Sequence, residues 1–299
     1  MIFTYITLFL RIISNPVANA FQKKIVQENS AIVSNFYTYA FMSLCCVPFV
    51  LKTDWTNINA NVYYNAFFAG MLCSTGTACL IKALQSGDLS VLGPINSYKC
   101  IVGLVTAFLL LGEIPTWLGF LGMIFIILGS WFVFDATDEG FSIKLFKRRD
   151  IQLRFLALLL TGIEAGFLKK VIILSSPVIS FYLWCFSGAL FSFILVILFK
   201  KNFEKVKKNY LKDYVIVASC LAIMQLSTNY VFDNMNVGFA LSLFQLSTLV
   251  SLFLGFKMFH EKDMTKKIIG TVVMIVGSIL VLTTWYHQNR NNSRRHRII

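Results

Sequence analysis

Residues 109–130 read LLLGEIPTWLGFLGMIFIILGS and join the end of one apolar segment to the start of the next through a Gly-Glu-Ile-Pro turn. The polar and small residues of this stretch recur later in the chain, displaced by 148 positions (261 − 113). Glu113, Gly122, Gly129 and Ser130 return as Glu261, Gly270, Gly277 and Ser278. Apolar residues in two helices often match by chance. A glutamate, two glycines and a serine that all recur at the same displacement are not expected to match by chance. The stretch therefore indicates an internal repeat, which fixes the architecture before any local assignment.

The front of each half repeats as well, displaced by 146 positions (167 − 21). Phe21, Lys23, Lys24, Ser30 and Ser34 return as Phe167, Lys169, Lys170, Ser176 and Ser180. Because the front and the back of the unit both recur in the same order, we infer that the second half of the chain repeats the first.

The composition is that of a membrane protein. Of the 299 residues, 57% are hydrophobic and only 14% are charged, whereas a soluble domain carries roughly 25% charged residues. The net charge of +13 comes from lysines and arginines that mostly occupy short loops between apolar segments. Such loops mark a membrane face rather than a nucleic-acid site, so we expect a lipid bilayer and no nucleic acid as the partner. The seven cysteines lie within apolar segments without CxxC spacing, so we expect neither a disulfide framework nor a metal site.

Ten apolar segments are each long enough to cross a bilayer, which takes about 20 helical residues. They span residues 2–21, 31–51, 62–85, 89–111, 115–135, 153–174, 178–199, 212–236, 238–259 and 266–286. The charged segment 136–152 divides them into two sets of five, so we expect repeats at 1–135 and 153–286 and a basic tail at 287–299. Because five is an odd number, the second repeat enters the membrane in the opposite sense. The predicted fold is an all-α integral membrane protein of ten transmembrane helices in two inverted repeats, a plan typical of transporters.

Four short sequences carry a resemblance to a known family. FQKKIV and FLKKVI end the first and sixth spans, and the blocks LLLGEIPTWLGFLGMIFIILGS and KMFHEKDMTKKIIGTVVMIVGS begin the last span of each half. In these sequences the chain resembles the EamA family of the drug/metabolite transporter superfamily, over nearly its whole length. The resemblance implies a ten-helix, two-repeat secondary carrier, often an exporter of amino acids or other small metabolites. We expect it in the cell membrane, plasma or inner.

Polar residues inside the spans are the candidates for function, because a charge at mid-bilayer costs roughly 2.5–3.5 kcal/mol on insertion scales. In the first span, Arg11, Asn15, Asn19 and Gln22 are spaced 4, 4 and 3 residues apart and share one helical face. Pro16 lies within this stripe and removes a backbone hydrogen bond. The stripe either lines a cavity or packs between helices, with Arg11 extending to the membrane surface.

Three further spans carry comparable residues. Gln225, Asn229 and Asp233 share a face of the eighth span, although Asp233 stands near its end, where a solvated carboxylate is equally expected. Asn96 and Lys99 share a face of the fourth span, and Lys99 is too deep to reach the surface easily, so it is the strongest candidate for contacting an anionic substrate. Gln245 aligns with Ser97 in the repeat (245 − 148) and is expected to face the same axis.

Glu164, in the sixth span, has two interpretations. Burial favours the protonated carboxyl and a nearby cation favours the ionised one, so Glu164 either exchanges protons during transport or forms a fixed ion pair with Lys99 or Arg11. Asp233 is a second candidate for proton exchange. Glu113 and Glu261 precede the last span of each half, where we expect them to cap that helix, and the repeated glycines are expected to form a packing stripe.

No HExxH, GxSxG, Walker A or dinucleotide-binding pattern occurs, so we expect neither an enzyme nor a cofactor. The leading hypothesis is a secondary carrier that moves a small polar metabolite by alternating access, and we expect it to be an exporter. The alternative is a non-transporting receptor or scaffold, which would pair its polar stripes tightly and leave no cavity. The loop charges place both termini outside and the resemblance places them inside. The chain is compatible with a monomer or a homodimer.

Overall fold

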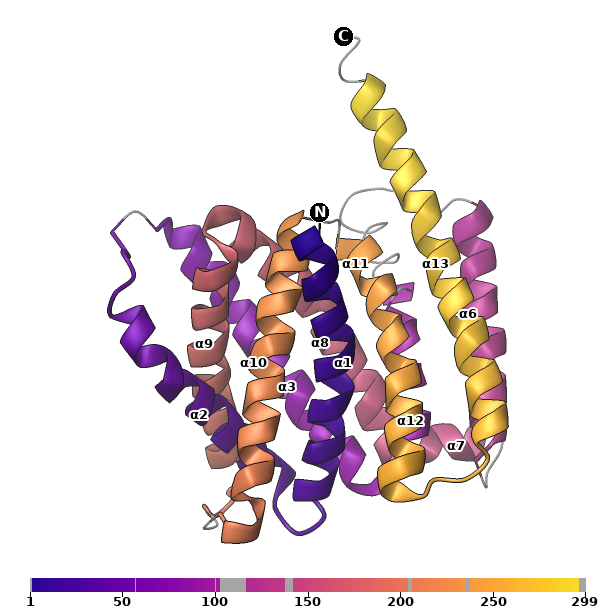
Figure 1. Cartoon of the computed structure of the whole chain (residues 1–299), viewed down its shortest axis with the longest axis horizontal. Coiled ribbons are helices and arrows are strands. Elements are labelled where there is room, and N and C mark those ends of the chain that lie inside the picture. Colours follow the sequence, from indigo (N-terminus) through magenta and orange to yellow (C-terminus); the bar gives the residue numbers. More distant parts are fainter. Residues whose placement is uncertain are drawn as a thin grey trace.

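The computed structural model describes residues 2–56, 58–99, 101–102, 117–137, 142–203, 206–234 and 237–295. These residues form helices and connecting turns, with no β-strand anywhere in those ranges (Figure 1). The predicted all-α fold is confirmed. Glu113 and the turn around it lie outside the described residues.

The helices fall into two sets. The first set comprises α1 (Ile2–Ile25), α2 (Ala31–Val50), α3 (Ala60–Ser86), α4 (Leu89–Leu92), the 3-10 helix η1 (Pro94–Tyr98) and α6 (Trp117–Asp135). The short α7 (Ile143–Lys147) leads into the second set. This comprises α8 (Arg149–Leu174), α9 (Pro177–Leu198), η2 (Lys208–Tyr210), α10 (Leu211–Asn234), α11 (Val237–Leu243), η3 (Phe244–Leu246), α12 (Ser247–Phe259) and α13 (Met264–Arg295).

The first helices of the two sets run in opposite directions. Lys23, in the last turn of α1, reaches Glu261, which also binds the backbone at the start of α4. Asp150, in the first turn of α8, lies against Gly87 beside that same start, so close that a Cβ on Gly87 would be 2.6 Å from its Oδ2. Therefore α1 ends, and α8 begins, at the same end of the bundle. The first turn of α1 and the last turns of α13 lie at the other end (Figure 1).

The contacts between the two sets are reciprocal. The first helix of one set packs on the third helix of the other, as α1 does on α10 and α3 on α8. The other contacts between the sets include two pairs of equivalent helices, α2 with α9 and α6 with α13, and also join α3 to α9 and α12 to both α1 and α4. Self-complementary pairing of this kind is the pattern of a two-fold axis, here between two parts of one chain. The arrangement fits the two-repeat architecture predicted from the sequence.

The repeated glycines hold α6 and α13 together at close range. A Cβ on Gly270 would lie 2.4 Å from the carbonyl oxygen of Gly129, and one on Gly277 would lie 2.6 Å from that of Gly122. Only residues without a Cβ permit this approach of two backbones. The predicted packing stripe is confirmed, and the structure adds that the two copies of the stripe pack on each other.

Two of the ten predicted spans are interrupted. The span predicted at 89–111 contains α4 and η1, and its remaining described residues end at 102. Pro94, at the start of η1, has no N–H to continue the α-helix. The span predicted at 238–259 is divided into α11, η3 and α12, and the Gln245 side chain donates to the carbonyl of Leu241 one turn earlier, in competition with the helical ladder. By contrast, α1 continues through Pro16.

Four helical segments of the described chain are long and apolar enough to cross a membrane: Ala31–Val50, Ala60–Ser86, Pro177–Leu198 and Lys208–Asn234. The ends of most other helices also agree with prediction to within a few residues. Two boundaries differ more. The segment expected as the linker 136–152 contains α7 and the first turn of α8, because Leu145 and Ile151 are buried there. The last helix, expected to end at 286, continues to Arg295.

Candidate functional site

A cavity of about 110 Å³ lies between the two sets of helices. Side chains from α1, α2, α3 and η1 of the first set line it, together with side chains from α8, α9, α10, α11 and η3 of the second set. Seven of the predicted site residues reach it: Arg11, Asn15, Asn19, Asn96, Lys99, Glu164 and Gln225. The structure thus brings together, around one cavity, polar residues that the sequence analysis identified separately in four helical segments.

Arg11 is buried beside the cavity. Its side chain is only 8% exposed, and its guanidinium carbon lies 4.2 Å from the centroid of the Phe244 ring. Among the described residues, its Nε and Nη1 atoms have no hydrogen-bond partner, nor do the two amide atoms of the buried Gln22, three turns further along α1. The predicted stripe of α1 lines a cavity, and Arg11 does not extend to the surface. Buried donors without partners are costly, so these groups are available to a ligand or to water.

Glu164 and Lys99 face the same cavity from α8 and from the end of η1. Glu164 is 7% exposed, and its Oε1 atom has no hydrogen-bond partner in the part of the chain that the structure describes. Lys99 is half-buried and interacts electrostatically with Arg154, Glu164 and Arg11. Within the described chain, no direct ion pair joins Glu164 to any of these cations. The interpretation of Glu164 as half of a fixed ion pair is therefore the less favoured of the two.

Arg154 is a cavity residue that the sequence analysis missed. It stands in the second turn of α8, is buried, and donates from Nε to the carbonyl of Leu92 at 2.7 Å. Its Nη2 donates to Asn96 Oδ1 at 3.1 Å. Arg154 thus binds the chain where α4 is interrupted and orients one predicted site residue. The signal in the sequence was Pro94, because a proline inside a span leaves backbone carbonyls free, and a buried donor is then expected nearby.

An aromatic and thiol cluster forms another wall. Trp184 Nε1 donates to Cys73 Sγ at 3.1 Å, and the Tyr39 hydroxyl lies 3.3 Å from Thr77 Oγ1. The rings of Tyr39 and Trp184 lie 4.9 Å apart between centroids. All four side chains line the cavity, so an aromatic surface lies beside the charged groups.

Three predicted site residues do not line the cavity. Asn229 is fully buried, accepts from Gln225 at 2.9 Å and donates to the carbonyl of Pro177 at 2.9 Å. Gln245 is also fully buried, and its Oε1 accepts from Asn96 at 3.4 Å. Both stand behind cavity residues and orient them. Asp233 is exposed at the end of α10, where it interacts electrostatically with Lys169, so the structure places this proton-exchange candidate apart from the cavity.

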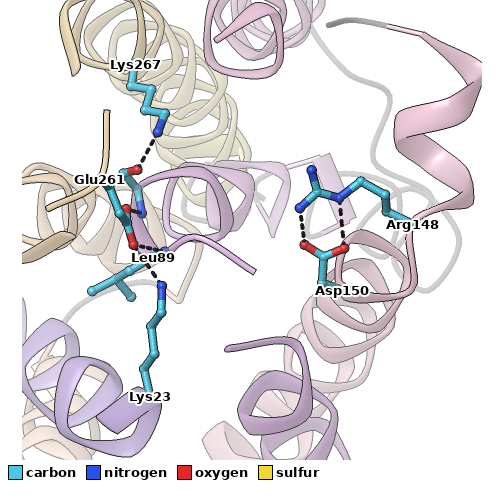
Figure 2. A network of polar contacts seen from close by, with 7 residues as sticks. Lys23, Leu89, Arg148, Asp150, Glu261 and Lys267 are labelled. Carbon is cyan, nitrogen blue, oxygen red and sulfur yellow. Dashed lines mark hydrogen bonds and ion pairs between the residues drawn. The ribbon is translucent and has the colours of Figure 1, made fainter. Parts of the chain in front are cut away.

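One end of the bundle is joined by a cluster around Glu261 (Figure 2). Its carboxylate accepts 2.8 Å hydrogen bonds from Lys23 Nζ, from the Leu89 amide and from the Ser90 amide. Lys267 donates to the Ser90 hydroxyl at 2.9 Å. Glu261 therefore caps α4, in the other half of the chain, because its two carboxylate oxygens accept from the first two amides of that helix. The expectation that it caps its own following helix was wrong.

The surroundings of Glu261 stabilise its ionised form. Burial alone would raise its pKa, but the charge of Lys23 and the hydrogen bonds from Lys23 and Ser90 outweigh burial and lower the pKa below its ordinary value. The carboxylate is therefore a fixed negative charge at neutral pH. It joins α1, α4 and the turn before α13, which belong to both halves.

Comparisons with known proteins agree with this architecture. The sequence profile of the EamA-like transporter family matches residues 2–135 and 150–283. The chain is similar to a solved crystal structure of another protein, with a TM-score of 0.66 and 12% sequence identity. The match covers 95% of this chain and 98% of the other chain. That likeness concerns the fold alone. A search of the curated proteins gives no match.

The family match occurs twice and covers most of the sequence, one copy for each set of helices. The apolar helices and this match identify an integral, multi-pass membrane protein. Members of the family are transporters in the membrane. The chain belongs to the EamA-like transporter family.

Proposed function

We propose that this protein is a secondary transporter that exports a small polar metabolite, amino acid-like or anionic, across the cell membrane by alternating access. Its repeats would occupy 1–135 and 153–286, with ten membrane-crossing segments. In that arrangement α4, η1 and the residues after them form one interrupted crossing, and α11, η3 and α12 form its counterpart. Interrupted helices at the interface of inverted repeats are where such carriers bind their cargo.

The observation that carries the proposal is the cavity between the repeats, with buried side chains that lack partners. Arg11 and Glu164 are both more than nine-tenths buried and carry unsatisfied polar atoms at this cavity. A scaffold would be expected to pair such groups within the protein, since unpaired buried charges are costly. A carrier leaves them for its substrate. The cavity therefore favours transport over the scaffold hypothesis.

The substrate contacts follow from the position of each group. Arg11 and Lys99 would bind an anionic group of the substrate. Asn15, Asn19, Asn96 and Gln225 would hydrogen-bond its polar atoms, with Asn229 and Gln245 holding Gln225 and Asn96 in position. Glu164 would exchange a proton with the cavity during the cycle. Asp233 has no part in this scheme, because it is exposed at the end of α10.

Alternating access requires that one end of the cavity open while the other closes. In the present conformation the Glu261 cluster joins α1, α4 and the turn before α13. These contacts would have to separate for the cavity to open at that end. The repeats would then rock about the two-fold axis that relates them.

The test is a thermal-shift screen of amino acids, nucleosides and sugar phosphates on the purified chain, followed by uptake of the stabilising compounds into proteoliposomes. In Lys99→Ala and Glu164→Gln variants that insert normally, we expect uptake to fall by roughly tenfold or more, the loss expected for one charged contact. The matched control is Lys82→Ala, since Lys82 is exposed on α3, does not line the cavity and donates to Gln85. Right-side-out and inverted vesicles distinguish export from import.

One result would count against the assigned residues, and another would count against transport. Normal uptake in both cavity variants would remove Lys99 and Glu164 from the mechanism. A compound that binds with an affinity sensitive to Lys99→Ala, yet never accumulates in proteoliposomes, would instead support the receptor hypothesis.

A further inference from the structure

The charges around the cavity are strongly unequal. Three cationic side chains line it, Arg11, Lys99 and Arg154, whereas Glu164 is the one carboxylate among the described residues that line it. With all four ionised, the net charge is +2 (3 − 1). The cations come from both halves of the chain, Arg11 and Lys99 from the first and Arg154 from the second.

The described residues do not neutralise this charge locally. Arg11 packs on the ring of Phe244 and has unpartnered donors. Arg154 donates to two neutral oxygens, the carbonyl of Leu92 and Oδ1 of Asn96. Lys99 interacts electrostatically with both arginines as well as with Glu164. The carboxylate of Glu261 does not line the cavity and is already bound by Lys23 and by backbone amides.

Uncompensated charge in a low-dielectric interior is costly, and a ligand that neutralises it gains most of that energy on binding. A monoanion would leave one positive charge in the cavity, and a zwitterion would leave two. A dianion would leave none. Protonation of Glu164 would increase the excess, so it would strengthen rather than remove the preference.

We infer that the cargo is a small dianion, carrying either two carboxylates or one phosphate monoester. The inference rests on the proposed transport function and names the charge class of its substrate. Cations from both repeats would contact the same ligand, so the dianion would bridge the two parts that move relative to each other. The cavity of about 110 Å³ restricts the cargo to a small molecule.

The first experiment compares ligands of similar size that differ in charge. At neutral pH succinate carries a net charge of −2, succinamate −1 and γ-aminobutyrate 0. Glycerol 3-phosphate represents the phosphate monoesters. Binding is measured by calorimetry on the full chain in detergent, and uptake is measured in proteoliposomes. We expect succinate or glycerol 3-phosphate to bind, and succinamate to bind roughly tenfold more weakly than succinate or worse, because one charge contact is lost.

The second experiment removes one cation. In Lys99→Gln and Arg11→Gln we expect the preference for the dianion over the monoanion to fall by roughly tenfold. The charge-retaining Lys99→Arg and the exposed control Lys82→Gln are expected to keep it. Melting curves without ligand establish that each variant is folded, and the two cavity variants are independent tests.

The outcomes separate this inference from the proposed function. Tighter binding of γ-aminobutyrate or succinamate than of either dianion, with uptake of the preferred compound, would overturn the dianion and leave transport intact. Binding of neither dianion would overturn it as well. Binding of a dianion without uptake would uphold the charge preference and overturn the transport proposal.

Discussion

Lys23 Nζ lies 2.8 Å from Glu261 Oε1, although the two residues are 238 positions apart in the sequence. Their side chains are only 9% and 4% exposed. The same carboxylate caps the first turn of α4. Glu261, in the turn before α13, therefore holds the end of α1 against the start of the interrupted helix.

Replacing Glu261 is expected to be strongly destabilising. Glu261→Ala would leave the ammonium of Lys23 and two backbone amides without partners, and the loss of one member of a buried ion pair costs about 3–5 kcal/mol. The melting temperature in detergent should fall markedly. Glu28→Ala is the control, because its ion pair with Lys207 is exposed and should contribute little. Equal melting temperatures for the two variants would contradict the role assigned to the cluster.

The same residue should make stability depend on pH in the acid range. Its pKa is lower in the folded protein than the ordinary value of 4.5. A lowered folded-state pKa contributes stability that is fully present above the ordinary value and is lost as the pH falls below it. The wild-type melting temperature should therefore drop on acidification below about that value. In Glu261→Gln the melting temperature should fall less on acidification. An equal fall in this variant and the wild type would show that other carboxylates cause it.

Arg154→Lys tests whether Arg154 positions the interrupted helix or only supplies charge. Lysine keeps the charge but lacks the planar group that reaches Leu92 and Asn96 together. We expect uptake to fall by roughly tenfold, comparable to the loss of one charge-assisted hydrogen-bonded contact, with the preference among ligand charges retained. Arg149→Lys, at an exposed position of the same helix, is the control. Wild-type uptake in Arg154→Lys would limit its role to charge.

Gly270→Ala should force α6 and α13 apart. The added methyl group would lie 2.4 Å from a backbone oxygen that cannot move independently, and overpacking of this kind costs about 1–3 kcal/mol. Gly166→Ala is the matched control, because nothing lies within 4 Å of its position, and alanine is the better helix former there. The melting temperature should fall in the first variant and remain or rise in the second.

The sequence predicts the architecture well because the evidence lies in residue types that rarely match by chance. The repeated glycines and Glu261 indicate the two halves, and the odd number of spans in each half predicts their inversion. The stripe through Arg11, Asn15 and Asn19 follows from helical spacing alone, and these residues do line the cavity. Periodicity determines which residues share a face of one helix.

Periodicity does not determine what lies opposite that face. Asn229 has the same spacing signal as the cavity residues, and Gln245 was predicted from its alignment with Ser97, but nearby carbonyls of Pro177 and Leu241 occupy their amides. Arg154 follows the basic residues before α8 and therefore resembles a charge at the membrane surface. The packing of α8 against the interrupted helix places the Arg154 side chain inside the bundle, and this packing cannot be read from the sequence. The target of Glu261, 172 positions away at Leu89, is likewise a tertiary contact.

The packing of Arg11 on Phe244 has a consequence for biogenesis. The ring that covers the guanidinium is translated 233 residues later (244 − 11), long after α1 has emerged from the ribosome. During synthesis α1 therefore enters the membrane, or stays beside the insertion machinery, before the Phe244 ring exists to cover the guanidinium of Arg11. Its final placement depends on the late arrival of the other half, so a nascent chain truncated before η3 should retain α1 poorly.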